Sequence, residues 1–145
     1  MLEQIEAVMD AHLDGMEKSR DEGSLSYTGA VEIENVVAGV SMIFFEGSLC
    51  RAMVQLTEVP AAHTASALRL CARINQHAIY RATLEDTVFV LSLDMLLGDA
   101  FEPEMVMQGL YALLEGARLY HIAELHSFLG ELSNTLPADD GGLVN

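Results

Sequence analysis

The sequence predicts a single α+β domain, in which a largely antiparallel sheet packs with helices. Segments with apolar residues at three- and four-residue steps indicate helices near the start, middle and end of the chain. Short alternating segments joined by turn residues indicate antiparallel hairpins between those helices. The 145 residues are 51% hydrophobic, which suffices for one core. We expect the order α-β-β-β-α-β-β-α over residues 1–133, followed by a flexible acidic tail at 134–145.

The first half of the chain is predicted to hold one helix and three strands. Lys18 and Arg20 are expected near the negative terminus of the first helix, and Gly23 is expected to break it. A half-buried strand follows, because apolar and acidic residues alternate at 31–34. Residues 37–60 are predicted to form two strands joined at Glu46-Gly47-Ser48. The apolar positions of the first helix are Leu2, Ile5, Val8, Met9, Leu13 and Met16.

The second half is predicted to hold two helices around one hairpin. The first of these helices covers about residues 61–78, and the hairpin that follows turns at Glu85-Asp86. A long helix is expected over 103–133, because Pro103 lacks the N–H that would be unpaired in a first turn. On the 61–78 helix, one face is expected to carry Ala67, Leu68, Cys71, Ile74 and Asn75, and another Leu70, Arg73 and His77.

The long helix is predicted to be apolar around most of its circumference. Such a helix is usually covered on more than one side, either deep inside its own chain or by another subunit or a partner. The expected buried stripe is Val106, Leu110, Leu113, Ala117, Tyr120, Phe128 and Leu132. Further apolar surface is expected from Met105, Met107, Tyr111, Leu114, Leu119 and Ile122.

The net charge is −15, from 22 acidic and 7 basic residues, and no three basic residues are adjacent. Direct binding to nucleic acid or anionic lipid is therefore not expected, since both require clustered Lys and Arg. An acidic domain attracts a basic partner, although the charge also has a plainer role in keeping the protein in solution. No apolar run approaches the roughly 18 residues of a membrane span. Without a secretory signal, we expect a cytoplasmic protein in which Cys50 and Cys71 stay reduced and buried.

No nucleotide-binding, metalloprotease, hydrolase or calcium-binding motif is present, so no cofactor and no catalytic role are expected. His121 and His126 are five residues apart, which separates them by about 140° around a helix and argues against a shared metal ion. The six carboxylates of residues 84–104 could hold a divalent metal, in particular around Asp94 and Asp99. Each also has a structural explanation, at a hairpin tip, after a strand or at the start of a helix.

The segment "CARINQHAIYRATLEDTVFVLSLDMLLGDAFEPEMVMQGLYALLEGARLYHIAEL" resembles the YbjN family and, more broadly, the type III secretion chaperone-like fold. The similar features are "RIN" closing a helix, the hairpin, an acidic helix start and the final "LLEGARLY". The resemblance implies a compact α+β fold that forms dimers. Secretion chaperones bind extended segments of partner proteins without ATP, and YbjN-like proteins are associated with bacterial stress responses and regulation.

The sequence therefore predicts a non-enzymatic, dimeric, chaperone-like or regulatory protein that binds and stabilises a partner protein, which could be basic or nucleic-acid-associated. A dedicated type III secretion chaperone is the alternative, and a metal-binding or enzymatic domain is an alternative of another class. The candidate dimer interface, by resemblance, is Leu70, Arg73, His77 and Tyr80. The candidate partner or dimer contacts on the long helix are Met105, Tyr111 and Ile122.

Overall fold

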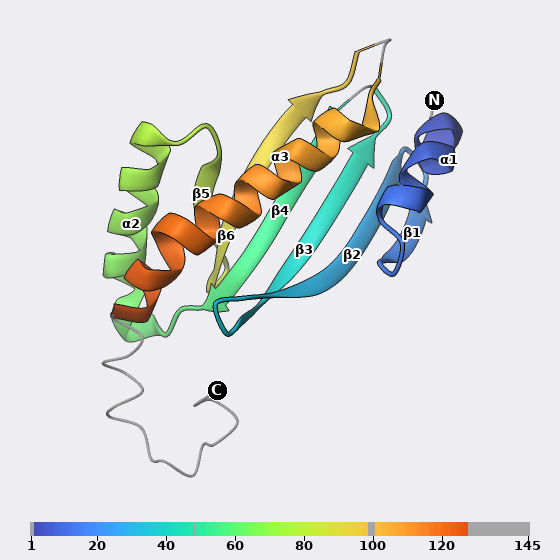
Figure 1. The fold of residues 1–145 in the computed structure, drawn as a ribbon. Helices are drawn as coiled ribbons and strands as arrows, with labels where there is room; N and C mark the ends of the chain where they lie inside the picture. Colours follow the sequence, from blue (N-terminus) through green and yellow to red (C-terminus); the bar gives the residue numbers. More distant parts are fainter. Residues whose placement is uncertain (1, 48, 99–100, 128–145) are drawn as a thin grey trace.

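The computed structural model describes residues 2–47, 49–98 and 101–127. They form six antiparallel strands in the order β1-β2-β3-β4-β6-β5 together with three helices, which confirms the predicted α+β class (Figure 1). The predicted tail and the last residues of the long helix lie outside the described residues. The elements are α1 (Leu2–His12), β1 (Glu17–Asp21), β2 (Ser24–Ile33), β3 (Val36–Phe45), β4 (Leu49–Glu58), η1 (Ala61–His63), α2 (Thr64–His77), β5 (Arg81–Glu85), β6 (Val88–Leu96), α3 (Pro103–Gly116) and η2 (Ala117–His121).

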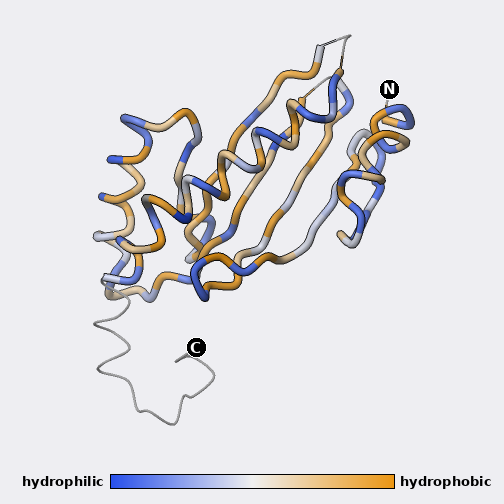
Figure 2. Tube along the Cα trace, viewed as in Figure 1, coloured by the Kyte–Doolittle hydropathy of each residue, from blue (hydrophilic) through white to orange (hydrophobic). Residues whose placement is uncertain are grey.

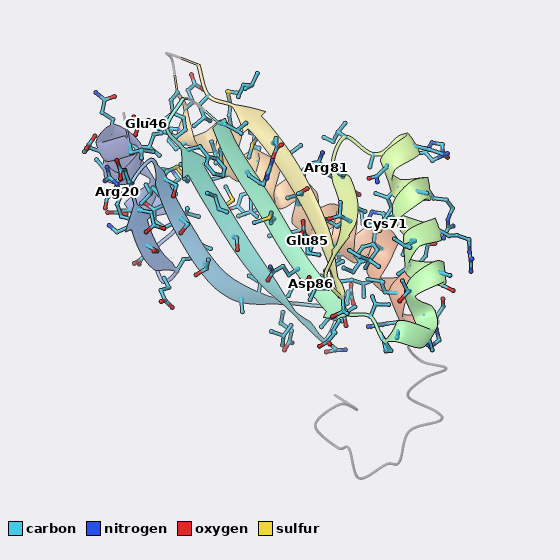
Figure 3. All side chains as sticks on the ribbon, turned by 180° about the vertical axis from the view of Figure 1, so that it is seen from behind. Arg20, Glu46, Cys71, Arg81, Glu85 and Asp86 are labelled. Atoms are coloured by element: carbon cyan, nitrogen blue, oxygen red, sulfur yellow. The ribbon has the colours of Figure 1, made fainter. Side chains whose placement is uncertain are left out.

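The helices cover one face of the sheet and leave the other face open. Helix α3 crosses the sheet over β4 and β6, whereas α1 lies against β2 at one end (Figure 1). Helix α2 stands beside the edge strand β5. From behind, no helix crosses in front of β3, β4 and β6 (Figure 3). The molecule therefore has a helix layer, a sheet layer and one uncovered sheet face.

Alternation along the central strands decides which side chains enter the core. In β3 and β4, every second residue is buried on the helix side of the sheet, while the residues between them are more exposed. In Figure 2, hydrophobic residues predominate along both strands and are interrupted by hydrophilic or neutral residues. Both cysteines are free and buried, as predicted. The buried residues of β3 and β4 are Ala38, Val40, Met42, Phe44, Cys50, Ala52, Val54 and Leu56.

The first predicted helix is shorter than expected, and β1 was missed. Helix α1 ends at His12, and Glu17–Asp21 pairs with β2 instead of continuing the helix. Lys18 lies 2.7 Å from a carboxylate oxygen of Glu6, and Arg20 lies 2.7 Å from the other. The two cations thus join β1 to the acidic side of α1 rather than stabilising a helix terminus. The strand was missed because "EKSRD" has no apolar residue, so it carries no alternating hydrophobic pattern.

The edge of the sheet at β5 is closed by a side chain of α2. The Nδ2 of Asn75 donates to the carbonyl of Ala82 at 3.0 Å, and the Oδ1 of Asn75 accepts from the Ala82 N–H at 2.7 Å. This pair of bonds satisfies the outward backbone groups of Ala82 as a neighbouring strand would. Asn75 therefore fixes α2 to the sheet and blocks strand pairing at this position.

The long helix contains one wide turn that the sequence did not reveal. Ala117–His121 is a π-helix, in which the N–H of Ile122 donates to the carbonyl of Ala117, five residues earlier. The extra residue rotates everything after it by about 100°, so a new set of positions faces the core. Ile122 is only 3% exposed and Leu125 only 2%. Ile122, which was predicted as a surface contact, is therefore a core residue.

Gly116 is predicted to be essential for the packing of this turn. A Cβ at Gly116 would collide with the ring and hydroxyl of Tyr80, whereas one at Gly109 would meet the flexible end of Met95. We expect Gly116→Ala to lower the free energy of unfolding by about 1–3 kcal/mol, because overpacking outweighs the gain in helix propensity. Urea unfolding measures this, with Gly109→Ala as the control and a smaller expected loss. Equal or higher stability of Gly116→Ala would contradict the packing described.

Candidate functional site

The uncovered side of β3, β4, β6 and β5 is named the open face. Cross-strand partners point to the same side of a sheet, so the register assigns its members. Phe45, Leu49 and Leu96 form one transverse row, and the next row contains Ile43, Arg51 and Asp94. Figure 3 shows this side of the sheet. Its members are Val37, Gly39, Ser41, Ile43, Phe45, Leu49, Arg51, Met53, Gln55, Val88, Val90, Ser92, Asp94, Leu96, Arg81, Thr83 and Glu85.

Much of the open face is apolar. Leu96 is 83% exposed and Val37 is 69% exposed, although both are strand residues. Val90 is 1% exposed, yet it does not belong to the main core cluster, so side chains of the open face itself cover it. The half-buried apolar residues are Ile43, Phe45, Leu49, Met53 and Val88. A surface of this composition is typical of a contact with another protein.

An ion pair occupies the row of the open face next to Phe45, Leu49 and Leu96. The guanidinium of Arg51 donates from Nε and Nη2 to the two carboxylate oxygens of Asp94, at 2.7 and 3.0 Å. Arg81 lies 3.9 Å from the same carboxylate. The hydrogen bond from Arg51 lowers the pKa of Asp94, which therefore stays ionised at neutral pH. Asp94 is thus compensated by cations of its own chain.

The same arrangement weakens the metal-site alternative. Asp94 is held by Arg51, and Asp99, its proposed companion, lies outside the described residues. Glu85 ends β5, and Asp86 adopts a positive φ of 58° in the turn before β6, as expected for a hairpin tip. Across the described ranges, no group of three or more His, Cys, Asp or Glu side chains is arranged to hold a metal ion.

Six of the seven basic residues form ion pairs with acids of the same chain. Arg73 lies 2.6 Å from Glu124, and Arg118 lies 2.6 Å from Glu115. Arg69 instead donates to the hydroxyl of Ser66 at 3.2 Å. The six paired residues are Lys18, Arg20, Arg51, Arg73, Arg81 and Arg118. The positive charges are therefore largely compensated within the chain, and the excess charge at its surface is negative.

The four residues predicted as a dimer interface do not form one surface. Leu70 is 2% exposed, because it belongs to the inward stripe of α2 with Ala67 and Ile74. Arg73 and His77 are exposed, whereas Tyr80 is half-buried. Leu70 is therefore packed within its own chain, and the dimer interface at these four residues stays a prediction. Leu68, which was grouped on one helix face with Ala67, Cys71 and Ile74, is 52% exposed, whereas those three residues are buried.

Two of these residues line a depression between α2 and residues 122–127. It has a volume of about 460 Å³ and is bridged at Arg73 by the bond to Glu124. Its lining is Ser66, Arg69, Leu70, Ala72, Arg73, Glu124 and Ser127. The depression does not include His77 or Tyr80, so it does not unite the predicted interface.

On α3, the predicted contacts Met105 and Tyr111 lie at the surface. Met105 is 60% exposed and Tyr111 is 58% exposed, which leaves both accessible to a partner. Ile122 is removed from this group by the π-helical turn. The predicted buried positions Val106, Leu110, Leu113 and Ala117 are confirmed.

A buried polar contact joins the chain before β5 to the π-helical turn. The hydroxyl of Tyr80 lies 2.8 Å from Nε2 of His121, and the two rings meet edge to face. His121 is 6% exposed, and its burial lowers the pKa of the imidazole below the ordinary value, partly opposed by Glu124. The contact between Tyr80 and neutral His121 thus connects the segment before β5 to the π-helical turn.

The sequence analysis missed the open face, although the sequence carried a signal for it. A sheet with one solvated face normally alternates apolar and polar residues. In "VSMIFF" of β3 and "VFVLSL" of β6, apolar residues occupy positions on both sides of the strand. Such runs indicate strands with apolar side chains on both faces. The predicted contact residues were placed mainly on helix surfaces instead.

The burial of His121 predicts a loss of stability in mild acid. Because its pKa is lower in the folded than in the unfolded chain, the stabilisation is complete above the ordinary value of 6.5 and is lost as the pH falls below it. We expect the free energy of unfolding, measured with urea, to change less between about pH 5 and pH 7.5 in His121→Gln than in wild type. Glutamine keeps a polar atom near the position of Nε2. The exposed His126→Gln is the control and should keep the wild-type difference. An unchanged pH dependence in His121→Gln would contradict this role.

No helix in the described part of the chain is both long and apolar enough to cross a membrane. No family model, curated protein or solved structure matches the chain. The resemblance to the YbjN family and to secretion chaperones therefore rests on the motifs quoted above, and the possible functions must be inferred from geometry and charge.

Proposed function

We propose that the chain is a non-enzymatic, cytoplasmic protein-binding domain that acts as a homodimer and binds and stabilises a basic partner protein. One observation carries this proposal: the basic side chains are largely compensated within the chain, so a partner meets an acidic surface. At the β1 edge, Glu17, Asp21 and Glu22 form no ion pair with another residue of the described ranges. Acidic surfaces of this kind raise the encounter rate with basic partners and repel nucleic acid.

The apolar surface adds a second source of binding energy. Met105 and Tyr111 of α3 are exposed by more than half. Apolar contacts supply most of the affinity of protein interfaces, whereas charge supplies the rate and the choice of partner. The combination supports binding of a protein more than binding of a small charged molecule.

The same geometry supports two biological settings for the proposed binding. By its resemblance to the YbjN family, the protein would act in bacterial stress responses or regulation. As the alternative, it would be a dedicated type III secretion chaperone for one exported protein. Genes for a secretion apparatus beside its own gene would favour the second setting, and their absence would favour the first.

Charge-directed binding predicts capture that is sensitive to salt. Immobilised full-length chain should retain a basic protein from lysate of its source cells at about 0.05 M salt and release it by about 0.5 M, because salt screens the attraction. Neutralising the β1 edge by Glu17→Gln, Asp21→Asn and Glu22→Gln should reduce the retained amount severalfold. The control changes Ser19, Ser24 and Ser26 to Ala on the same hairpin and leaves the charge unchanged. Capture that resists salt and survives neutralisation would contradict a charge-directed partner.

The alternative of another class, a metal-binding or enzymatic domain at Asp94 and Asp99, makes a contrasting prediction. Because Arg51 already neutralises Asp94, we expect Ca²⁺ or Mg²⁺ to raise the melting temperature no more than a salt of equal ionic strength. Thermal unfolding with each ion, on wild type and on Asp94→Asn with Asp99→Asn, measures this. A larger rise in wild type that disappears in the double variant would favour the metal site.

A further inference from the structure

We propose that the open face is the contact surface between two copies of this chain. The inference rests on the proposed homodimer and replaces the helix surface suggested by the resemblance. A second copy is the occupant that fits best, for reasons of charge, apolar area and edge protection.

Charge is the first reason. Each chain carries −15, so two copies repel one another wherever acidic surfaces meet. On the open face, two cations, Arg51 and Arg81, are balanced by two acids, Asp94 and Glu85, while Glu32 and Glu58 lie at its border. Figure 3 shows Arg81 and Glu85 on β5. Two copies can therefore meet through this face without adding uncompensated charge, whereas a strongly basic partner would gain little from it.

Apolar area is the second reason. Leu96, Leu49 and Phe45 lie side by side at one end of the face, and Val37 lies at the other end of β3. Ile43 and Met53 lie between them. The exposed fractions of Leu96 and Val37 are the highest of any strand residue among the large exposed hydrophobics. Burying them against an identical face removes apolar surface on both copies at once.

The size of the face matches this use. Strands β3 and β4 have ten residues each and β6 has nine, which gives a length of roughly 30 Å at about 3.3 Å per residue. With β5, the four strands span roughly 19 Å at about 4.8 Å per strand. Because β5 has only five residues, the flat area is on the order of 500 Å², the same order as the roughly 800 Å² of accessible surface that each partner contributes to a stable interface.

Edge protection is the third reason, because it excludes the competing way in which sheets associate. The β5 edge is closed by Asn75 and α2, and the β1 edge carries Glu17, Lys18, Arg20 and Asp21. Charged edge strands resist pairing with another strand. Association of two copies through the sheet therefore proceeds face to face.

Sedimentation equilibrium of the full chain tests the proposal. We expect a reversible monomer–dimer equilibrium between about 1 and about 100 µM, with a dissociation constant that falls as salt rises from about 0.05 to about 0.5 M. The direction follows because salt screens the repulsion between two acidic chains and leaves the apolar contact intact. Binding of a basic partner weakens under the same change, so the two associations respond to salt in opposite directions.

A matched pair of variants locates the contact. Leu96→Glu places a charge on the open face, whereas Ile79→Glu places one in the link between α2 and β5, and the two native side chains are 83% and 81% exposed. We expect Leu96→Glu to raise the dimer dissociation constant at least about 10-fold and Ile79→Glu to change it by less than about 2-fold. Val37→Glu is the second open-face variant and should act as Leu96→Glu does. Melting curves at low concentration confirm that each variant is folded.

The inference is overturned if the wild-type chain stays monomeric at about 100 µM in high salt, or if Ile79→Glu weakens the dimer as much as the open-face variants do. It is also overturned if salt dissociates the dimer. A monomer that still captures a basic partner refutes the open-face dimer alone. A dimer of the predicted salt dependence without any salt-sensitive partner refutes the proposed partner binding alone.

Discussion

The packing of one helix across one side of a six-stranded sheet is the constraint on which the rest of this molecule depends. Burial on the helix side selects the inward residues of β3, β4 and β6, with α3 against β4 and β6, and it forces their neighbours onto the opposite side. A single layer of helices cannot cover both sides. Apolar residues on the far side must then be tolerated in water or covered by another molecule. In this molecule, the open face carries those apolar residues.

Ion pairs within the chain keep the open face close to neutral. Every arginine except Arg69 is paired with a carboxylate, and the bidentate contact of Arg51 with Asp94 lies beside the most apolar row of the face. Pairs with this much exposure contribute little stability, since water screens them. Their effect is on the surroundings: the charge of a patch is cancelled locally while the chain as a whole stays strongly acidic. Apolar contact and acidic attraction are in this way separated onto different parts of the surface.

The elements predicted correctly share one property, which is that their signals are local. Gly47 adopts a positive φ in the β3–β4 turn, and Pro103 occupies the first turn of α3, as the sequence indicated. The β1 strand was missed because its residues are all exposed and polar. The π-helical turn follows Gly116, which packs closely against Tyr80, and no periodicity can reveal a contact between residues 36 positions apart.

The candidate site was harder to predict than the fold, for the same reason. Asp94 looked available in the sequence because its partner, Arg51, lies 43 residues earlier. Leu70 was assigned to the outside of α2, whereas it belongs to the buried stripe of that helix. The position of β5, to which Asn75 fixes α2, decides which side of the helix is buried. Ile122 was assigned to the surface because an unbroken helix would place it there. Long-range contacts decided each of these cases.

The amide of Asn75 has one more consequence. At Ala82, the amide of Asn75 takes the place that the backbone of a further strand would occupy. Without that amide, the N–H and carbonyl of Ala82 would be open to pairing with an extended neighbour, which is how exposed strand edges start aggregates. Asn75 thus combines two roles in one side chain, since it anchors α2 to the sheet and protects one position of the sheet edge.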